Sequence, residues 1–236
     1  MILSIDTSTD ITSIAIYRPS WGVLYEQSWE SGREQTTQLL PNVQRAMALV
    51  HTNVRELTGI AVATGPGSYS GVRIGLSTAK TLAYALGLPL WGVPSLDALA
   101  YSQVAVTAAQ VCAVLSMGRH RLAWALYRTK GTQWQRLTPY ANTTAEEMAL
   151  ATQNDVTSLP TLFCGEITAE TAEALTRVLG NSAAIAPAAA GLRRASYLAE
   201  LALQRANRGE SDDPATLQAI YLQPAVSPQQ SAVPTG

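Results

Sequence analysis

The same order of strand and helix patterns occurs twice along the chain, and this repeat limits the fold more than any other feature. In the first half, three strand patterns and a helical pattern are followed by two strand–helix pairs. The strands are predicted at residues 2–6, 11–17, 22–29, 59–64 and 90–93, and the helices at 36–50, 70–86 and 95–106. The second half is predicted to have strands at 111–117, 122–128, 132–137, 161–165 and 183–185, and helices at 143–153, 169–179 and 192–208. Each half is therefore predicted to have the order βββαβαβα.

An internal duplication of this order is the architecture of the actin-like ATPase fold (ASKHA, ribonuclease H-like), an α/β fold shared by sugar kinases and actin. We expect the first half at residues 1–105 and a smaller, degenerate second half at 106–190. A C-terminal helix within 191–222 is expected to pack back on the core, and residues 223–236 are expected to form an extended or mobile tail. This tail is rich in Pro, Gln, Ser and Ala and carries no charged residue.

The composition of the 236 residues is that of a soluble globular protein, with 47% hydrophobic and 14% charged residues. The formal net charge is −1, whereas a protein that holds nucleic acid by neutralising phosphates usually has a basic surplus. If RNA is the ultimate substrate, we therefore expect a partner to do most of the binding.

Targeting and redox signals predict a cytoplasmic protein that does not enter a membrane. The N-terminus lacks the basic and then apolar pattern of a signal peptide. Residues 98–118 are uncharged and about as long as a membrane span, but polar residues interrupt them, which favours a soluble helix followed by a buried strand. Cys112 and Cys164 lie in apolar runs and are predicted to be buried thiols in a reducing compartment.

A glycine-rich run, TGPGSYSGVRIG at residues 64–75, joins a predicted buried strand to a predicted helix. Gly65, Gly67 and Gly71 permit backbone conformations that other residues avoid, and Ser68 or Ser70 can cap the helix. Such a junction presents free N–H groups and the positive end of a helix dipole, which in principle suits an anion. No Gly-Lys-Ser/Thr follows and no GxGxxG is present, so a structural turn is favoured over a phosphate site.

This run and the sequence after it, TAKTLAYALGLPLWGVPSLDALA, resemble the signature of the TsaB (YeaZ) family. Residues 1–9 (MILSIDTST) resemble its N-terminal strand, and residues 220–222 (Ile-Tyr-Leu) resemble its C-terminal element. The resemblance is close over residues 1–100 and loose over 101–220. It implies an actin-like fold and a cytoplasmic bacterial protein. The implied function is that of a non-catalytic subunit of the complex that transfers a threonylcarbamoyl group to adenosine 37 of tRNA, with the catalytic paralogue TsaD and the small ATPase TsaE as partners.

Two positions depart from the family pattern. Gln35 stands where the family often has His, and the hairpin at 116–118 (Ser-Met-Gly) stands where it often has Asp-x-Arg. A role that requires charge at either position is therefore doubtful for this chain.

The second departure bears on catalysis. A phosphotransferase of the actin-like fold needs an acidic residue at each of two hairpins to hold Mg²⁺ and to position water or a hydroxyl. Asp6 supplies the first carboxylate, but the hairpin at 116–118 has none. Asp6 is therefore predicted to be a relic that hydrogen-bonds within the turn after the first strand. An ATP-dependent phosphotransferase or ATPase stays the alternative function.

The loops that would hold phosphates are accordingly treated as degenerate. Their candidate residues are Asp6, Thr7, Ser8, Gly65, Gly67 and Ser68. The chain alone is expected to bind no cofactor, with ATP and Mg²⁺ left to a composite site in the complex.

The sequence gives little support to two classes of hydrolase, the metal-dependent peptidases and the serine hydrolases. A metal-dependent peptidase needs about three His, Cys or carboxylate ligands, with at least two at helical spacing. The two histidines, His51 and His120, lie in different halves. For a serine hydrolase, the chain lacks a nucleophile motif of the G-x-S-x-G type.

The helix predicted at 70–86 is small or apolar nearly all round, with Arg73 and Lys80 as its charges. Such a helix needs cover on a second face, and Gly75 and Ala79 would let another helix approach closely. The predicted partner-binding residues on this helix and on 36–50 are Leu39, Val43, Met47, Val50, Val72, Ile74, Gly75, Ala79 and Leu82. The resemblance implies that this surface binds TsaD, or a second copy of the chain when TsaD is missing. The alternative, favoured for any single residue, is an ordinary core position.

The basic turn at 119–121 is predicted to be a solvated hairpin tip in preference to a tRNA contact.

Overall fold

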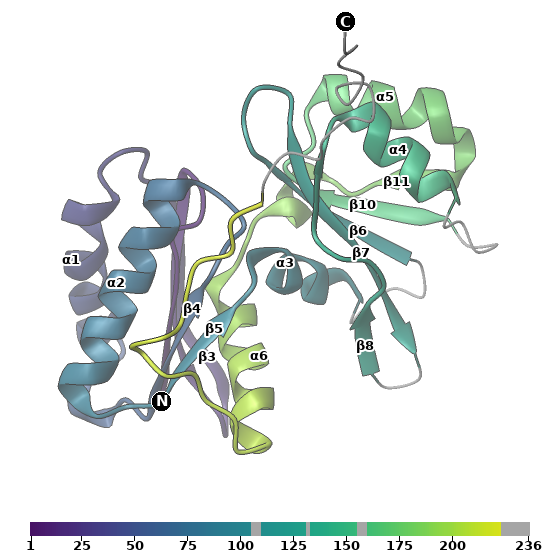
Figure 1. Cartoon of the computed structure of the whole chain (residues 1–236). Helices are drawn as coiled ribbons and strands as arrows, with labels where there is room; N and C mark the ends of the chain where they lie inside the picture. Colours follow the sequence, from purple (N-terminus) through teal and green to yellow (C-terminus); the bar gives the residue numbers. More distant parts are fainter. Residues whose placement is uncertain (105–109, 131–132, 155–159, 223–236) are drawn as a thin grey trace, which may run out of the picture.

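The computed structural model describes residues 1–104, 110–130, 133–154 and 160–222. Within these ranges the chain forms two α/β bodies that lie side by side, each built on one mixed β-sheet (Figure 1). The predicted tail at 223–236 and the predicted helix end at 105–106 lie outside the described residues. No helix in the described ranges is long and apolar enough to cross a membrane.

The first body is built on a five-stranded sheet with the order β3-β2-β1-β4-β5. Its strands are β1 (Ile2–Asp6), β2 (Ile11–Arg18), β3 (Gly22–Glu30), β4 (Gly59–Ala63) and β5 (Leu90–Val93). The first three form an antiparallel meander, whereas β1, β4 and β5 pair in parallel. Every residue of β1 and β4 is buried, because helices cover both faces of the sheet here.

Three helices cover this first sheet. They are α1 (Gln35–Leu49) and α2 (Tyr69–Leu86) on the outer face, and α6 (Ala195–Asn207) on the face toward the second body (Figure 1). The side chain of Ser68 caps the start of α2, and Gly87 ends the helix with a left-handed backbone at φ 62°. A single 3₁₀ turn at Val54–Glu56 precedes β4.

The second body is built on a six-stranded sheet. Its strands are β6 (Gln110–Ser116), β7 (Leu122–Lys130), β8 (Gln133–Arg136), β9 (Ala141–Thr143), β10 (Thr161–Gly165) and β11 (Ala183–Ile185). The order is β11-β10-β6-β7-β8, with β9 paired to β7. The sequence did not predict β9, because three residues are too few to show a strand periodicity.

Helices α4 (Ala145–Asn154) and α5 (Ala169–Leu179) pack on one face of the second sheet, and α3 (Ser95–Val104) packs on the other. The 3₁₀ turns Gly180–Ser182 and Ala188–Gly191 flank β11. Cys112 and Cys164 are fully buried in this body and are not bonded to each other, which confirms the prediction of buried thiols.

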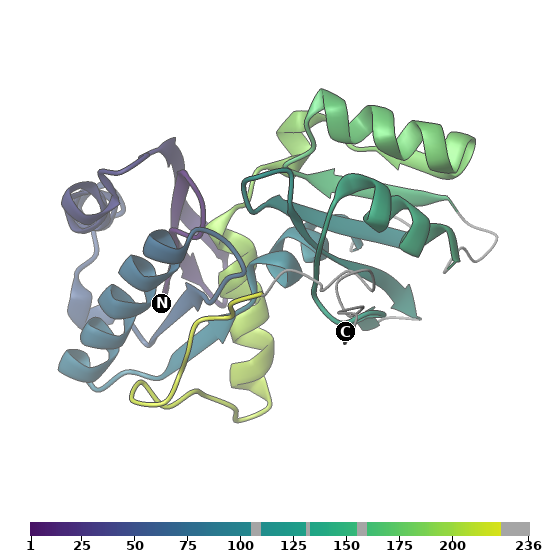
Figure 2. The same ribbon diagram turned by 45° about the horizontal axis from the view of Figure 1, so that its top comes forward.

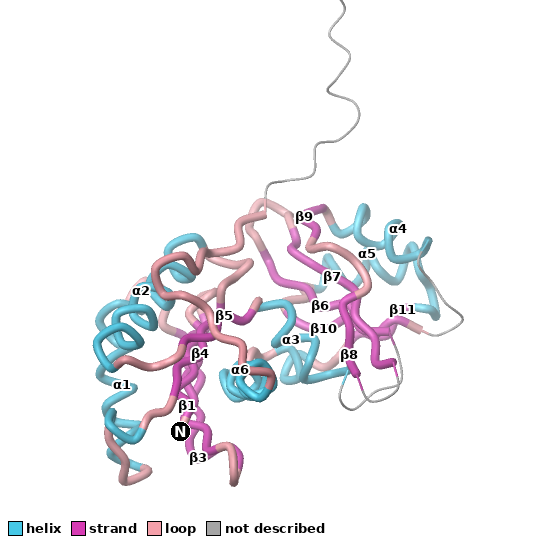
Figure 3. The backbone as a smooth tube through the Cα atoms, turned by 60° about the horizontal axis from the view of Figure 1, so that its bottom comes forward, coloured by secondary structure: helices cyan, strands magenta, loops and turns pink. Residues whose placement is uncertain are grey.

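Helices α3 and α6 are exchanged between the two bodies. Although α3 follows the strands of the first sheet, it packs on the second, and α6 packs on the first sheet at the end of the second repeat. The two helices touch where the bodies meet (Figures 2 and 3). At this contact the rings of Tyr101 and Tyr197 lie edge to face, with their centroids 5.9 Å apart. The exchange joins the two bodies through their cores.

After α6, residues 209–222 run back across the first body without a helix, between α2 and α6 (yellow in Figure 1). Arg205 of α6 pairs with Asp212 at 2.8 Å, and the same carboxylate accepts a hydrogen bond from the amide of Gly92. Further on, the amide of Ile220 donates to the carbonyl of Thr64. This segment therefore closes the edge of the sheet beside β5.

Candidate functional site at the junction of the two bodies

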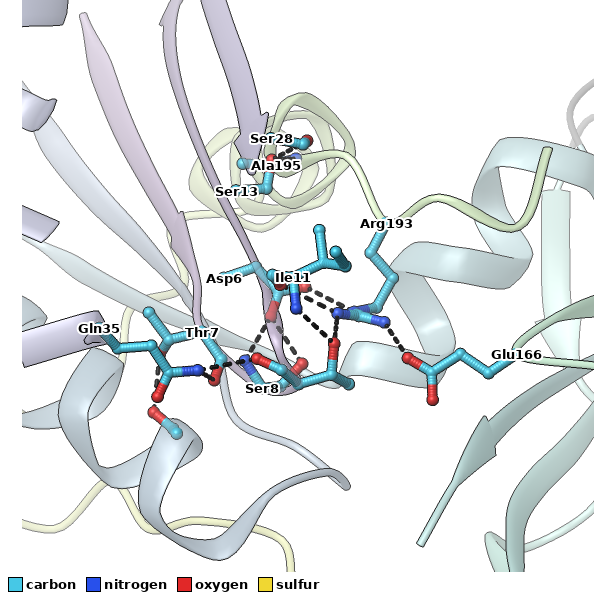
Figure 4. Close-up of polar contacts among 12 residues, drawn as sticks. Asp6, Thr7, Ser8, Ile11, Ser13, Ser28, Gln35, Glu166, Arg193 and Ala195 are labelled. Atoms are coloured by element: carbon cyan, nitrogen blue, oxygen red, sulfur yellow. Dashed lines mark hydrogen bonds and ion pairs between the residues drawn. The ribbon is translucent and has the colours of Figure 1, made fainter. Parts of the chain in front are cut away.

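The first strand ends at Asp6, whose carboxylate is held within the turn that follows. Its Oδ1 accepts hydrogen bonds from the amide of Ser8 at 2.8 Å and from the hydroxyl of Ser8 at 2.6 Å (Figure 4). This is the local pattern by which Asp stabilises a turn, and it is the arrangement predicted for Asp6.

The second oxygen of Asp6 pairs with Arg193, which the sequence did not predict. The Nε atom of Arg193 lies 3.2 Å from Asp6 Oδ2, and both side chains are almost fully buried, at 4% and 2% exposed. The Nη2 atom of Arg193 donates to the hydroxyl of Thr9 and to the carbonyl of Ile11 (Figure 4). The guanidinium group thus binds the end of β1, the turn that follows it and the start of β2.

The same guanidinium group reaches the second body through Glu166. Its Nη1 atom lies 2.9 Å from Glu166 Oε1, and Glu166 Oε2 accepts a hydrogen bond from the amide of Ser116 at 2.9 Å. The hairpin at 116–118 has no carboxylate of its own, but Glu166, which follows β10, brings one to it. We call this arrangement the Asp6–Arg193–Glu166 bridge.

The glycine-rich loop before α2 is filled by the turn that follows β1. A Cβ atom on Gly67 would lie 2.1 Å from the carbonyl oxygen of Ser8, and the amide of Ser68 donates to that oxygen. The amide of Gly71 donates to the Ser68 hydroxyl. These glycines therefore allow the backbone of the turn to approach, and two of the amides that would face an anion are engaged by the protein itself. This geometry agrees with the structural turn favoured from the sequence.

Comparison with known proteins identifies the family to which the chain belongs. A family model described as "TsaD: tRNA N6-adenosine threonylcarbamoyltransferase" matches residues 10–226. The tRNA threonylcarbamoyladenosine biosynthesis protein TsaB of Bacillus subtilis is 31% identical over 205 residues, which cover 86% of this chain and 87% of the relative. The chain belongs to the TsaB (YeaZ) family. In several other relatives the match covers a smaller share of the relative's length: 47%, 35% and 58% in three of them.

Solved structures agree on the fold. YeaZ from Pseudomonas aeruginosa superposes with a TM-score of 0.78 at 23% identity, covering 94% of this chain and 99% of that one. A ROK family protein from Streptococcus pneumoniae, solved with sucrose, superposes with a TM-score of 0.51 at 12% identity, covering 87% and 99%. The predicted actin-like α/β fold is confirmed.

Gln35, the position at which this chain departs from the TsaB family pattern, is buried at the start of α1. Its Nε2 atom donates to the carbonyl of Thr9 at 2.8 Å and lies 3.5 Å from the carbonyl of Thr7. The amide therefore ties α1 to the turn after β1 as a neutral donor (Figure 4).

The predicted partner-binding residues do not form a surface. Six are buried in the core between the two outer helices and the first sheet: Leu39, Val43, Met47, Val72, Gly75 and Ala79. The other three, Val50, Ile74 and Leu82, are partly buried against the same core. For the six buried residues the prediction of a surface position is wrong, because an apolar stripe at helical spacing marks the face that covers the sheet. The exposed face of the same helices carries Leu40 and Leu49 on α1 and Tyr69 and Tyr84 on α2.

A groove of about 630 Å³ lies in the second body, between the hairpin after β6 and the first turns of α4 and α5. Two pairs of side chains on its walls lie close together. His120 lies 3.7 Å from Glu170, Arg177 lies 3.2 Å from Glu146, and the first of these pairs is strongly exposed. The basic turn at 119–121 thus faces glutamates.

Among the described residues, no three His, Cys, Asp or Glu side chains come together in a way that suits a metal ion.

Sequence reasoning missed the Asp6–Arg193–Glu166 bridge. Asp6 and Arg193 are 187 residues apart, and Arg193 and Glu166 are separated by 27. The one local hint is the pair Arg193-Arg194 directly before an apolar helix, where charged side chains need partners.

Proposed function

We propose that this chain is a non-catalytic scaffold subunit of the cytoplasmic complex that transfers a threonylcarbamoyl group to adenosine 37 of tRNA. Relatives named "tRNA threonylcarbamoyladenosine biosynthesis protein TsaB" and the transferase description of the matching family model support this process. In this account the chain binds the catalytic paralogue TsaD and supports the ATPase TsaE. It pairs with a second copy of itself when TsaD is missing, and it meets tRNA only through the complex.

The Asp6–Arg193–Glu166 bridge is the observation that carries the non-catalytic part of the proposal. A phosphotransferase needs free carboxylate oxygens to hold Mg²⁺. Here Asp6 accepts bonds from Ser8 and Arg193, and Glu166 accepts bonds from Arg193 and Ser116, so all four oxygens have a donor. A metal ion would have to displace a buried guanidinium group. This disfavours the phosphotransferase alternative and any cofactor bound by the chain alone.

We assign partner binding to the outward face of α1 and α2. Tyr84 is 86% exposed and Leu49 is 57% exposed, and Leu40 and Tyr69 lie on the same two helices. Tyrosine is enriched at protein interfaces because its ring supplies apolar area together with a polar group. These helices form the outermost layer of the first body (Figure 1). The proposed binding surface is thus on the helices that the sequence indicated, but on the face that points away from the sheet.

Two measurements test the function. Transfer to tRNA by the paralogue is assayed with and without the chain, and calorimetry measures ATP·Mg²⁺ binding to the chain alone. We expect transfer to depend on the chain and no binding heat from the isolated chain. Tight ATP binding with hydrolysis by the isolated chain would favour the phosphotransferase alternative.

A further inference from the structure

We propose that the Asp6–Arg193–Glu166 bridge fixes the relative orientation of the two bodies, with Glu166 as its releasable contact. This inference concerns the conformation of the chain and does not depend on the proposed function.

The position of Arg193 in the chain suits this role. The chain passes from the first body to the second at Pro94, just before α3, and returns at residues 192–194, just before α6. Arg193 lies in the middle of this return. Immediately before it, the backbone at Gly191 lies so close to β10 that a Cβ atom on Gly191 would be 2.5 Å from the Gly165 carbonyl oxygen. The return segment is therefore docked on the end of β10.

The contacts of the guanidinium group are unequal on the two sides. It binds three groups of the first body, from Asp6, Thr9 and Ile11. It binds one group of the second body, Glu166, which is itself tied to Ser116. Loss of the Glu166 carboxylate would therefore release the second body and leave Arg193 attached to the first.

The other contacts at the junction are apolar or involve neutral groups. Where α3 meets α6, the side chains include Ala98, Ala195 and Ala199, which belong to one apolar cluster, and burial of such groups is non-directional. Two neutral hydrogen bonds also cross the junction, from Gln204 to the hydroxyl of Tyr101 at 3.1 Å and from Asn142 to the Leu222 carbonyl at 3.2 Å. Among the ion pairs of the described residues, Arg193–Glu166 is the one that links the two bodies. Because charged hydrogen bonds are stronger than neutral ones, this pair is the contact that best selects one angle.

Energetics single out Glu166 as the residue to change. Arg193 and Asp6 are both buried. Removal of Arg193 would leave Asp6 as an unpaired buried charge, and removal of Asp6 would leave the buried Arg193 with the partly exposed Glu166 as its counter-ion, so either change endangers folding. The side chain of Glu166 is 33% exposed. In Glu166→Gln, Arg193 keeps Asp6 as its counter-ion, and the folded state should survive.

Pulsed electron paramagnetic resonance tests the proposal by measuring the distance between two spin labels, one on each body. Ser77→Cys on α2 and Thr176→Cys on α5 provide exposed label sites, whereas the native cysteines are buried. The parent should show one narrow distance distribution. Glu166→Gln should broaden it about twofold or add a second population, because the bodies are free to rotate. Glu170→Gln, an exposed glutamate on the same body, is the matched control and should leave the distribution unchanged.

A second variant keeps the test independent of charge. Gly191→Ala would push the return segment away from Gly165 and should also broaden the distribution. The proposal is overturned if Glu166→Gln and Gly191→Ala both keep the narrow distribution of the parent. It is equally overturned if Glu170→Gln broadens the distribution as much as Glu166→Gln does. Circular dichroism at the same temperature verifies that each variant is folded.

Discussion

Gly75 lies directly against Thr7: a Cβ atom at residue 75 would be 2.4 Å from the Thr7 hydroxyl oxygen. That hydroxyl donates to the carbonyl of Gly71 at 2.7 Å. The small residues on the inner face of α2 therefore hold the helix against the turn after β1. They serve the fold of the first body, whereas the sequence suggested that they admit a partner helix.

Gly75→Ala should destabilise the protein by about 1–2 kcal/mol. Overpacking a tight contact costs about 1–3 kcal/mol, and the higher helix propensity of Ala offsets up to about 1 kcal/mol of that. Urea unfolding measures the change, with Ser77→Ala on the exposed face of the same helix as the control. An unchanged unfolding midpoint would show that Thr7 does not pack against α2 as described.

Arg193→Met should destabilise the protein by about 3–5 kcal/mol, because it leaves the buried Asp6 carboxylate without its counter-ion. Asp6→Asn should destabilise it less, by about 1.5–3 kcal/mol, because Arg193 loses a charged hydrogen bond but keeps Glu166 as counter-ion. The double variant should lose less than the sum of the two, by about 1–3 kcal/mol, because the pair is in direct contact. Denaturant unfolding of the four proteins measures this coupling. Additive losses would contradict a direct ion pair.

Cys112 and Cys164 should be almost unreactive in the folded protein. Burial raises the pKa of Cys164 to about 12, and burial together with the neighbouring Cys164 raises the pKa of Cys112 well above its usual value. Because the thiolate is the reactive form, a disulfide reagent at neutral pH should react on the order of 100-fold slower with the folded chain than with the chain in urea. Rapid reaction of the folded chain would mean that β6 and β10 are open to solvent.

The contribution of Asp97 to the free energy of unfolding should decrease as the pH rises. Burial raises the pKa of Asp97 above its ordinary value of 3.8, although Tyr140 and Tyr127 donate hydrogen bonds to its carboxylate. A raised pKa in the folded state means that the contribution of Asp97 is fully present below pH 3.8 and is lost as the pH rises through the folded value.

The variant Asp97→Asn isolates this effect, because its amide oxygen still accepts the tyrosine hydrogen bonds. The difference in unfolding free energy, variant minus parent, should increase with pH above 3.8. Unfolding at a series of pH values measures it, and a difference that stays constant or decreases would contradict the assignment.

Local sequence signals explain how much of the fold could be predicted. The strands of the first body and α2 were predicted to within a residue or two, since Ser68 and Gly87 mark the ends of that helix and buried apolar runs mark the strands. The exchange of α3 and α6 between the bodies could not be predicted. Periodicity shows that a helix has an apolar face, but it does not show which sheet that face covers.

The same limit applies to the candidate site. The sequence analysis identified the apolar residues of α1 and α2 but assigned residues such as Leu39 and Val72 to a binding surface, whereas they face the core. Tyr84 is strongly exposed, but no local sequence pattern distinguishes it from a buried aromatic residue. The Asp6–Arg193–Glu166 bridge joins three distant segments, so no spacing rule could find it.

Binding of the catalytic paralogue to the outward face of α1 and α2 is tested most directly by light scattering on size-exclusion fractions of the mixed proteins. The parent chain should form a one-to-one complex with the paralogue from the same organism, displacing any homodimer. Tyr84→Asp should weaken this complex at least about tenfold, because a charge would replace an exposed interface aromatic. Leu150→Asp, on the exposed face of α4 in the second body, should leave it intact. A parent chain that forms no complex, or a Tyr84→Asp chain that binds as tightly as the parent, would contradict the account.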